Sequence, residues 1–228
     1  MIDFHSHILP AVDDGSRSPG MSLDMIRSLS EQGVDTIVAS SHFYASDCTP
    51  ERFLHRRQAA YESLLSDLGA DAPKILLGAE VLYYPGVSQM EQLPKLCVEG
   101  TKILLLEMPF TRWSEHYIRE VQELAASKLY TVLLAHVERY SEPRSVWDQL
   151  LEQGVLMQSN AGFFLSLRTR RKALKLLRDG RIHLLGSDAH NMNERAPHMA
   201  EAARIIRRRG GQSVLDEIDA RGRALLGC

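Results

Sequence analysis

The chain has 228 residues, of which 44% are hydrophobic and 25% are charged, and its formal net charge is −2. These values are typical of a globular protein and exclude a disordered or collagen-like chain. The balanced charge predicts no general affinity for nucleic acid, and the apolar runs are too short for membrane insertion. The chain opens Met-Ile-Asp-Phe-His, unlike a signal peptide, and its three cysteines are widely spaced. We therefore expect a reducing cytoplasm as its location.

Short apolar or β-branched runs alternate with helical patterns along the whole chain. Such repeated strand–helix units favour a parallel sheet with helices outside it. The predicted strands are residues 1–4, 36–40, 75–77, 103–106, 131–135, 156–158 and 183–185. This pattern predicts one α/β domain spanning residues 1–228, built as a small irregular barrel. An open doubly wound sheet is the alternative.

The helices between these strands have recognisable starts, stops and apolar stripes. Ser18 followed by Pro19 predicts a helix start, and Gly33 predicts its end. A helical tail is expected after Ala196. Apolar residues at helical spacing predict three further helices. Their stripes are Leu54, Tyr61, Leu65 and Leu68; Ile118, Val121, Leu124 and Ala125; and Val146, Leu150 and Leu151.

Histidines and carboxylates follow six of the seven predicted strands. Because loops after parallel barrel strands open on one face, these side chains are expected to converge there. The residues are His5, His7, Asp13, Asp14, His42, Glu80, Glu107, His136, Asp188 and His190. One such residue means little, but convergent imidazoles and carboxylates are what a multinuclear metal site requires.

The other histidines serve as a comparison. His55 and His116 fall inside predicted helices, off the apolar stripes, and His183 starts the last predicted strand, at the opposite end from the site. All three are interpreted as surface or rim residues. His198 is left unassigned.

Several motifs together resemble a known superfamily, the polymerase and histidinol phosphatase (PHP) superfamily. The segments FHSHILPAVDDGSRS, LLEMPF, AHVERY, QSNAGFF and SDAHNMNERAPHM are most similar to its metal-dependent tyrosine phosphatases of bacterial capsule and exopolysaccharide operons (CpsB-type). The resemblance runs from Met1 to about residue 210. It implies the PHP fold, a distorted seven-stranded (β/α)7 TIM-like barrel. It also implies three divalent metal ions, for which Mn²⁺ is expected and Fe or Zn are alternatives.

The resemblance also implies which residues hold each metal. Glu80 would bridge the first two metals, and Asp14 rather than Asp13 is chosen from the family pattern. The implied ligands are His5, His7, Glu80 and Asp188 for the first metal; Glu80, Glu107 and His136 for the second; and Asp14, His42 and His190 for the third.

Two arginines follow the site motifs, Arg139 after His136 and Arg195 after His190. The family uses matching arginines to bind phosphate, so both are predicted to act in substrate binding and catalysis. Four carboxylates against three divalent cations leave a formal charge of about +2, which suits a phosphomonoester dianion. The implied activity is metal-assisted hydrolysis of phosphotyrosine without a covalent intermediate.

A thiol-based phosphatase needs an arginine six positions after its cysteine. Leu54 stands there after Cys48, and Ile103 stands there after Cys97, so this route is excluded. The alternatives that remain are hydrolysis of a small phosphomonoester such as histidinol phosphate, a nuclease, and a non-catalytic metal-binding regulator. An amidohydrolase is disfavoured because Glu107 stands where that class usually has a modified lysine.

The partner that the resemblance implies is a phosphotyrosine protein, a membrane-associated tyrosine autokinase in this family. Two basic runs, residues 168–181 and 204–209, are interpreted first as solvated helix faces and alternatively as a docking surface. The oligomeric state stays open, with a homo-oligomer among the alternatives.

Overall fold

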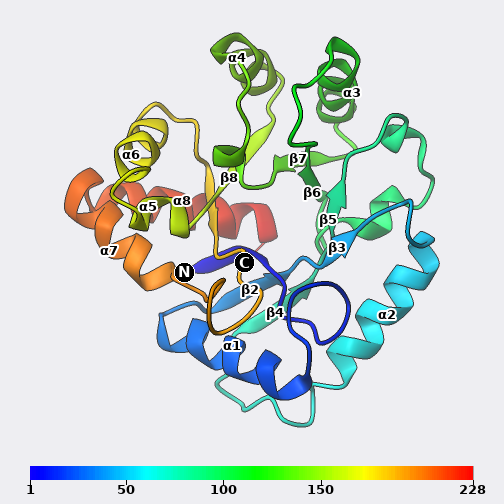
Figure 1. Ribbon diagram of the computed structural model, residues 1–228, viewed down its shortest axis with the longest axis vertical. Helices are drawn as coiled ribbons and strands as arrows, with labels where there is room; N and C mark the ends of the chain where they lie inside the picture. The colour runs from blue at the N-terminus through cyan, green and yellow to red at the C-terminus, as the bar shows by residue number, and fades with distance from the viewer. Residues whose placement is uncertain (228) are drawn as a thin grey trace.

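The computed structural model describes residues 1–227, so Cys228 lies outside the described residues. Strands and helices alternate along this part of the chain, and the helices surround the strands (Figure 1). The strands are β1 (Ile2–Ser6), β2 (Thr36–Ala39), β3 (His42–Phe43), β4 (Lys74–Leu77), β5 (Glu80–Leu82), β6 (Ile103–Glu107), β7 (Thr131–Leu134), β8 (Leu156–Asn160) and β9 (Leu184–Gly186). The α-helices are α1 (Pro19–Glu31), α2 (Pro50–Glu62), α3 (Glu115–Ala126), α4 (Arg144–Glu152), α5 (Gly162–Leu165), α6 (Arg170–Arg178), α7 (Met199–Gly210) and α8 (Gln212–Leu226).

All the strand pairs are parallel, as the alternating pattern predicts. The hydrogen bonds divide the curled sheet into two pieces, one with the order β1-β2-β4 and one with the order β3-β5-β6-β7-β8-β9. Within residues 1–227, the expected ring of seven strands is therefore described as nine strands in two pieces. A parallel bridge from Ser6 to Ala189 brings the end of β1 beside the segment that follows β9.

The seven predicted strands are all present, with bounds shifted by one or two residues. Strands β3 and β5 were not predicted because each is only a few residues long and lies just beyond an interruption. The stripe predicted for α2 is partly wrong. The helix ends at Glu62, and the turn that follows leaves Leu65 exposed and buries Leu64 instead.

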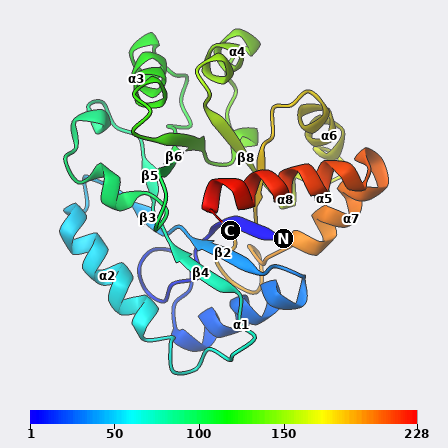
Figure 2. The same ribbon diagram turned by 180° about the vertical axis from the view of Figure 1, so that it is seen from behind.

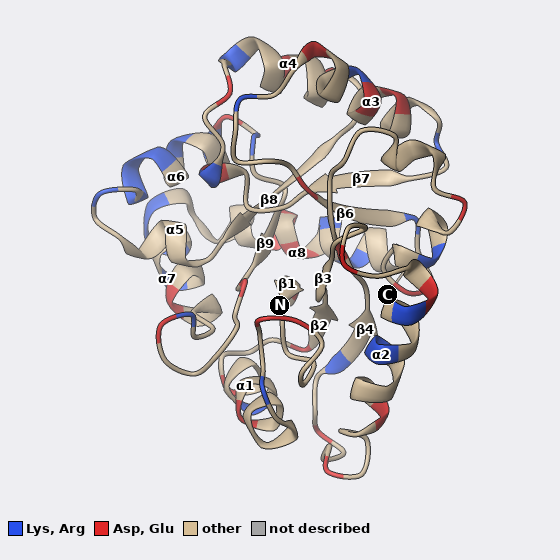
Figure 3. Ribbon diagram, turned by 45° about the vertical axis from the view of Figure 1, so that its right-hand side comes forward, with Lys and Arg blue, Asp and Glu red and all other residues tan. Residues whose placement is uncertain are grey.

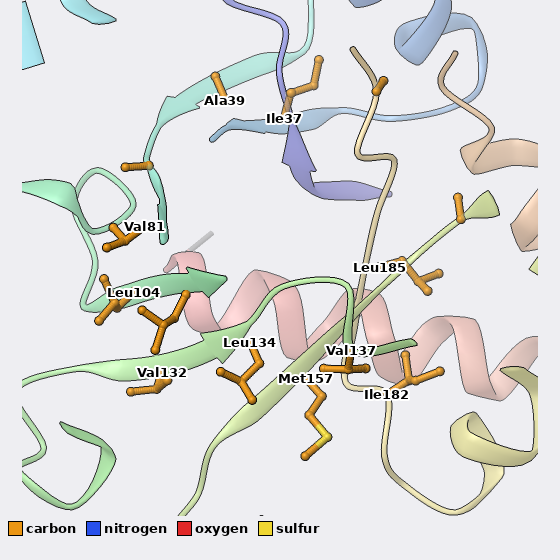
Figure 4. Packing of buried hydrophobic residues seen from close by; sticks show 14 of the residues in the cluster. Ile37, Ala39, Val81, Leu104, Val132, Leu134, Val137, Met157, Ile182 and Leu185 are labelled. Atoms are coloured by element: carbon orange, nitrogen blue, oxygen red, sulfur yellow. The ribbon is translucent and has the colours of Figure 1, made fainter. Parts of the chain in front are cut away.

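The strands are buried on both faces, which explains why their sequences are continuous apolar runs. Alternate residues of one strand belong to different clusters: Leu104 packs in one, whereas Ile103 and Leu105 pack in the other. Figure 4 shows side chains of the first cluster, such as Leu104 and Val132, which come from neighbouring strands. Because the period of a strand is two, this alternation fixes which residues face the helices.

Helices α7 and α8 occupy the region where a helical tail was expected. Helix α8 lies on the reverse side of the strands, in front of them when the molecule is seen from behind (Figure 2). Its Arg223 binds Asp35, just before β2, and its Arg221 donates to the carbonyl of His183, just before β9. This helix therefore covers the amino ends of the strands. None of the helices within residues 1–227 is both long and apolar enough to span a membrane.

Candidate active site

The carboxyl ends of the strands bring together the histidines and carboxylates that the sequence singled out. His5 lies inside β1 rather than after it, His42 begins β3, Glu80 begins β5 and Glu107 ends β6. A register shift between Asp3 and Ser6 interrupts the pairing of β1 with β2. Three groups of these side chains have ligand atoms close enough to share a cation: His5, His7 and Glu80; His42, Glu80 and Glu107; and His7, Asp14, His42 and His190.

Glu80 lies at the centre of the arrangement and is fully buried. Its Oε2 atom lies 3.1 Å from His5 Nε2, 3.3 Å from His7 Nε2 and 3.0 Å from His42 Nδ1. Its Oε1 atom lies 2.8 Å from His136 Nε2. The two oxygens thus face different sets of histidines, an arrangement that would let this carboxylate bridge two cations.

Asp188 and Glu107 extend the cluster to either side of Glu80. Asp188 Oδ1 lies 3.6 Å from His5 Nε2 and 3.5 Å from His7 Nε2. Glu107 Oε1 lies 3.3 Å from His136 Nε2. This geometry places each carboxylate beside the histidines with which it is predicted to share a metal.

Asp14 forms a third corner at the surface of the site, and its side chain is 65% exposed. Its Oδ1 atom lies 3.5 Å from His42 Nε2 and 3.3 Å from His190 Nε2. Asp13, in contrast, exposes only 5% of its side chain and accepts hydrogen bonds from the backbone N–H groups of His42 and Gly15. The neighbouring aspartates therefore make different contacts: of the two, Asp14 is the one with a carboxylate oxygen beside the rings of both His42 and His190.

Hydrogen bonds on the far side of three imidazoles fix their tautomers. The Nδ1 atom of His7 lies 2.7 Å from Asp13 Oδ2, and that of His190 lies 3.0 Å from the carbonyl oxygen of Asp188. The Nδ1 atom of His5 lies 3.1 Å from Gln158 Oε1. Each acceptor requires Nδ1 to carry a proton, which leaves the Nε2 lone pair free. Such outer hydrogen bonds are characteristic of metal-binding histidines.

Several buried polar atoms of the cluster lack a hydrogen-bond partner. They include Glu80 Oε2, His42 Nδ1 and His190 Nε2. Because an unsatisfied buried polar group costs about 1–3 kcal/mol, a native protein rarely keeps several together without a ligand. These atoms all face the cluster, so the donor set fits divalent cations bound by nitrogen and oxygen.

The backbone at two of the predicted ligands is strained. His136 has φ 31° and Asp188 has φ 52°, both in the left-handed region that residues other than glycine seldom adopt. Gly186 permits the close approach of β9 to β1, because a Cβ atom there would lie 2.5 Å from the Cβ of His5. Such strain is concentrated at functional sites, where side-chain placement outweighs backbone preference.

The density of charge shifts the pKa values in the cluster. Burial opposes ionisation of Glu80, but the Coulombic effect of His5 and a hydrogen bond from His136 hold its pKa well below its usual value. Burial likewise disfavours the charged form of His136, yet Glu107 and Glu80 raise its pKa to about 9. Burial and the neighbouring His7 lower the pKa of His190 to about 4, which keeps its imidazole neutral. Glu80 therefore supplies anionic oxygen to a cation, and a cation bound by His136 would displace the proton of its imidazole.

Arg139 and Arg195, predicted to bind phosphate, both reach the cluster. Each donates a hydrogen bond to Asp188, that of Arg195 measuring 2.9 Å. About a third of each arginine side chain remains exposed, so both guanidinium groups lie at the mouth of the site. Their contact with a carboxylate in the cluster was not anticipated from the sequence.

Gln158 and Asn160 of β8 are site residues that the sequence reasoning did not single out. Gln158 Oε1 accepts from the backbone N–H of His136, and its Nε2 donates to Asn160 Oδ1 at 2.9 Å. Asn160 in turn donates to Asp188 Oδ2 at 2.7 Å. The signal available in the sequence was the run of polar residues at the end of a buried strand. This strand, predicted over residues 156–158, was the one of the seven to which no site residue had been assigned.

The histidines interpreted as surface or rim residues lie outside the cluster. His55 and His116 are exposed on α2 and α3, and His183 accepts a hydrogen bond from the N–H of Met157. His198 precedes α7 and lies 3.9 Å from Glu201. Cys97 is buried, and this burial raises the pKa of its thiol to about 11, the opposite of an activated nucleophile.

Comparison with known proteins gives consistent results over almost the whole chain. Residues 1–224 match the model of a family described as capsular polysaccharide synthesis, CpsB/CapC. The chain is 31% identical over 225 residues to the tyrosine-protein phosphatase YwqE of Bacillus subtilis, covering 94% of this chain and 87% of that protein. It is 28% identical over 241 residues to the tyrosine-protein phosphatase CpsB of Streptococcus pneumoniae, covering 96% and 94%.

A solved structure from a study of YwqE from Bacillus subtilis and CpsB from Streptococcus pneumoniae, described as unique metal-dependent tyrosine phosphatases, has a similar fold. It superimposes with a TM-score of 0.87 and 28% sequence identity, covering 100% of this chain and 94% of that one. More distant structures, such as an organophosphorus hydrolase mutant at 14% identity and a TM-score of 0.55, share the fold alone.

Proposed function

Since the chain belongs to the CpsB/CapC family of capsular polysaccharide synthesis, we propose that it is a metal-dependent protein-tyrosine phosphatase. The observation that carries this proposal is the cluster around Glu80, in which buried donor atoms without partners face one another. Relatives named tyrosine-protein phosphatases, matched over almost their full length, support the substrate class.

The ligand assignment forms part of the proposal. Three divalent cations, with Mn²⁺ as the expected metal, would be held by the nine predicted ligands. When bound, such cations lower the pKa of water and neutralise phosphoryl oxygens. The predicted ligands are His5, His7, Asp14, His42, Glu80, Glu107, His136, Asp188 and His190.

The protein's own groups would bind and orient the phosphate. Arg139 and Arg195 extend over Asp188 from two different loops, so their guanidinium groups could grip the phosphoryl oxygens from two sides. Asp13 and Gln158 hold the imidazoles of His7 and His5 in the tautomer that presents Nε2 to the site. No described cysteine is needed as a nucleophile.

Two features of the fold support finer proposals. The bridge between Ser6 and Ala189 supports closure of the curled sheet into a distorted seven-stranded barrel, with β2 and β3, and β4 and β5, each acting as one interrupted strand. One cluster of buried side chains extends from Ile8 to Leu215, which supports a single domain. A cytoplasmic location remains part of the proposal because it would keep the thiols reduced.

The proposed partner is a phosphotyrosine protein, with a membrane-associated tyrosine autokinase as the specific candidate. The charge distribution supports an anionic partner, because lysines and arginines gather on α6 (Figure 3). The alternative interpretation is that these basic residues form a solvated helix face that binds no partner. Binding of the protein to an acidic peptide at rising salt concentration would separate the two.

The decisive experiment combines metal analysis with hydrolysis of three substrates in parallel. Chelated protein should lose activity and Mn²⁺ should restore it, with a phosphotyrosine peptide turned over faster than a phosphoserine peptide or histidinol phosphate. Full activity at near-zero metal content would refute metal dependence. Preference for histidinol phosphate would instead assign a small-molecule phosphatase.

A further inference from the structure

Phe110 is a large apolar residue that remains exposed at the edge of the metal cluster. It lies in the loop between β6 and α3, three residues after Glu107, and 62% of its surface is exposed. Its ring stacks against the rings of His136 and Tyr140, each at a centroid distance of 5.9 Å with interplanar angles of 27° and 29°. The ring thus covers a predicted metal ligand and keeps much of its own surface open to solvent.

The loop that carries Phe110 is held on both sides of it. The N–H of Met108 donates to the Tyr140 hydroxyl at 2.9 Å, and the indole N–H of Trp113 donates to the carbonyl of Pro109 at 3.0 Å. The backbone N–H of Trp113 also donates to Glu142 Oε1 at 2.9 Å. The ring is therefore presented by a preorganised loop, which reduces the entropy lost when a ligand contacts it.

There is open space beside this ring. A cavity of about 260 Å³ is lined by residues 110–112 and 140–143. An isolated exposed apolar side chain is common and implies nothing by itself. Here exposure coincides with an anchored loop, a neighbouring cavity and stacking on a ligand of the site, which together indicate a contact surface for an aromatic group.

We propose that Phe110 is a substrate-binding residue that stacks on the aromatic ring of an aryl phosphate while the phosphate lies between Arg139 and Arg195. The inference rests on the proposed phosphatase function and adds the origin of its selectivity for aryl over alkyl phosphates. Aromatic pairs favour offset stacking at centroid distances of about 4.5–7 Å, the range in which Phe110 already meets its neighbours. An aliphatic phosphoserine side chain offers no ring for this contact.

The first test compares two peptides that differ only in phosphotyrosine or phosphoserine, with Mn²⁺-loaded protein. Phe110→Ala should lower kcat/KM for the phosphotyrosine peptide about 10-fold and leave that for phosphoserine within about 2-fold. Phe110→Tyr, which keeps a ring, should retain the wild-type ratio. Leu167→Ala is the matched control, because Leu167 is an exposed apolar residue outside the site. Equal losses on both peptides would overturn the proposal.

The second test measures binding without turnover, using calorimetry with phenylphosphonate and methylphosphonate. Phe110→Ala should weaken phenylphosphonate about 10-fold and leave methylphosphonate unchanged. Tyr44, which stacks on His42 at 5.0 Å, provides the competing platform. If Tyr44→Ala, rather than Phe110→Ala, removes the preference for the phenyl group, the ring is bound on the other side and the proposal is wrong.

The two tests separate this inference from the proposed function. A wild-type protein that hydrolyses no phosphotyrosine peptide but prefers phenylphosphonate through Phe110 would refute the phosphatase and leave the aromatic subsite in place. A wild-type protein that hydrolyses phosphotyrosine peptides with the same selectivity after Phe110→Ala would keep the phosphatase and refute the subsite.

Discussion

Gln158 Oε1 lies between two groups of the site, 3.1 Å from His5 Nδ1 and 2.7 Å from the backbone nitrogen of His136. Because the backbone N–H can only donate, this atom must be the carbonyl oxygen of the side chain, and His5 must donate to it from Nδ1. One buried amide thus fixes both the tautomer of a ligand on β1 and the strained turn after β7.

Gln158→Leu should lower metal affinity about 10- to 100-fold, because the outer hydrogen bond to His5 is lost. Gln158→Glu keeps an oxygen acceptor and should retain more affinity, although it cannot donate to Asn160. Titration calorimetry with Mn²⁺ measures both. Gln149→Leu, on α4, is the control, and an unchanged affinity in Gln158→Leu would contradict the role given to this amide.

The adjacent aspartates should respond differently to the same substitution. Asp13→Ala leaves the donors of His7, His42 and Gly15 without an acceptor and should lower the free energy of unfolding by about 2–3 kcal/mol. Asp14→Ala, at an exposed position, should change stability by less than about 0.5 kcal/mol while lowering metal stoichiometry. Urea unfolding of the metal-free variants and metal analysis measure the two effects. Equal stability losses would contradict the assignment.

Arg139→Ala should keep metal content and fold but lose a charged hydrogen-bond donor to phosphate, worth about 1.5–3 kcal/mol. The expected loss in kcat/KM is about 10- to 150-fold. Arg139→Lys should recover only part of it, because an ammonium group lacks the planar fork. His136→Ala should lose metal as well as activity. If Arg139→Ala lowers metal content instead of kcat/KM, its contact with Asp188 is structural.

The stability of the protein should depend on pH through His183. Its Nδ1 accepts from Met157 N–H, and burial together with the charge of Arg221 lowers its pKa to about 4. Between that value and about 6.5 the unfolded state binds a proton that the folded state does not, so stability falls as pH falls through this window. The loss is on the order of 3 kcal/mol at pH 4.

The corresponding variant is His183→Gln, which should show a flatter dependence of unfolding free energy on pH than the wild-type protein. Chemical denaturation at several pH values between 4 and 7 measures the difference. His55→Gln, at an exposed position on α2, should follow the wild-type curve. A His183→Gln curve parallel to that of the wild-type protein would show that His183 titrates normally.

The sequence by itself determined seven of the nine described strands and the polar residues that follow most of them. Runs such as residues 103–106 are apolar on both faces, which only a covered parallel sheet accommodates, and parallel strands necessarily bring their carboxyl ends together. The spacing of His5, Glu80 and His136 relative to these runs therefore predicted their convergence. The motifs of the sequence also predicted membership of the CpsB-type phosphatases, and the comparisons with known proteins confirmed this family.

Only the tertiary structure decided how each side chain is used. The bond from the His42 backbone to Asp13, the buried amide of Gln158 and the contact of Arg139 with Asp188 join chain segments far apart in sequence. The stacking of Phe110 on His136 also joins two separate loops. Local patterns record which residues are apolar or polar. Hydrogen-bond partners such as His5 and Gln158, which are 153 residues apart, are fixed only when the strands pack, because tertiary contacts override local preference.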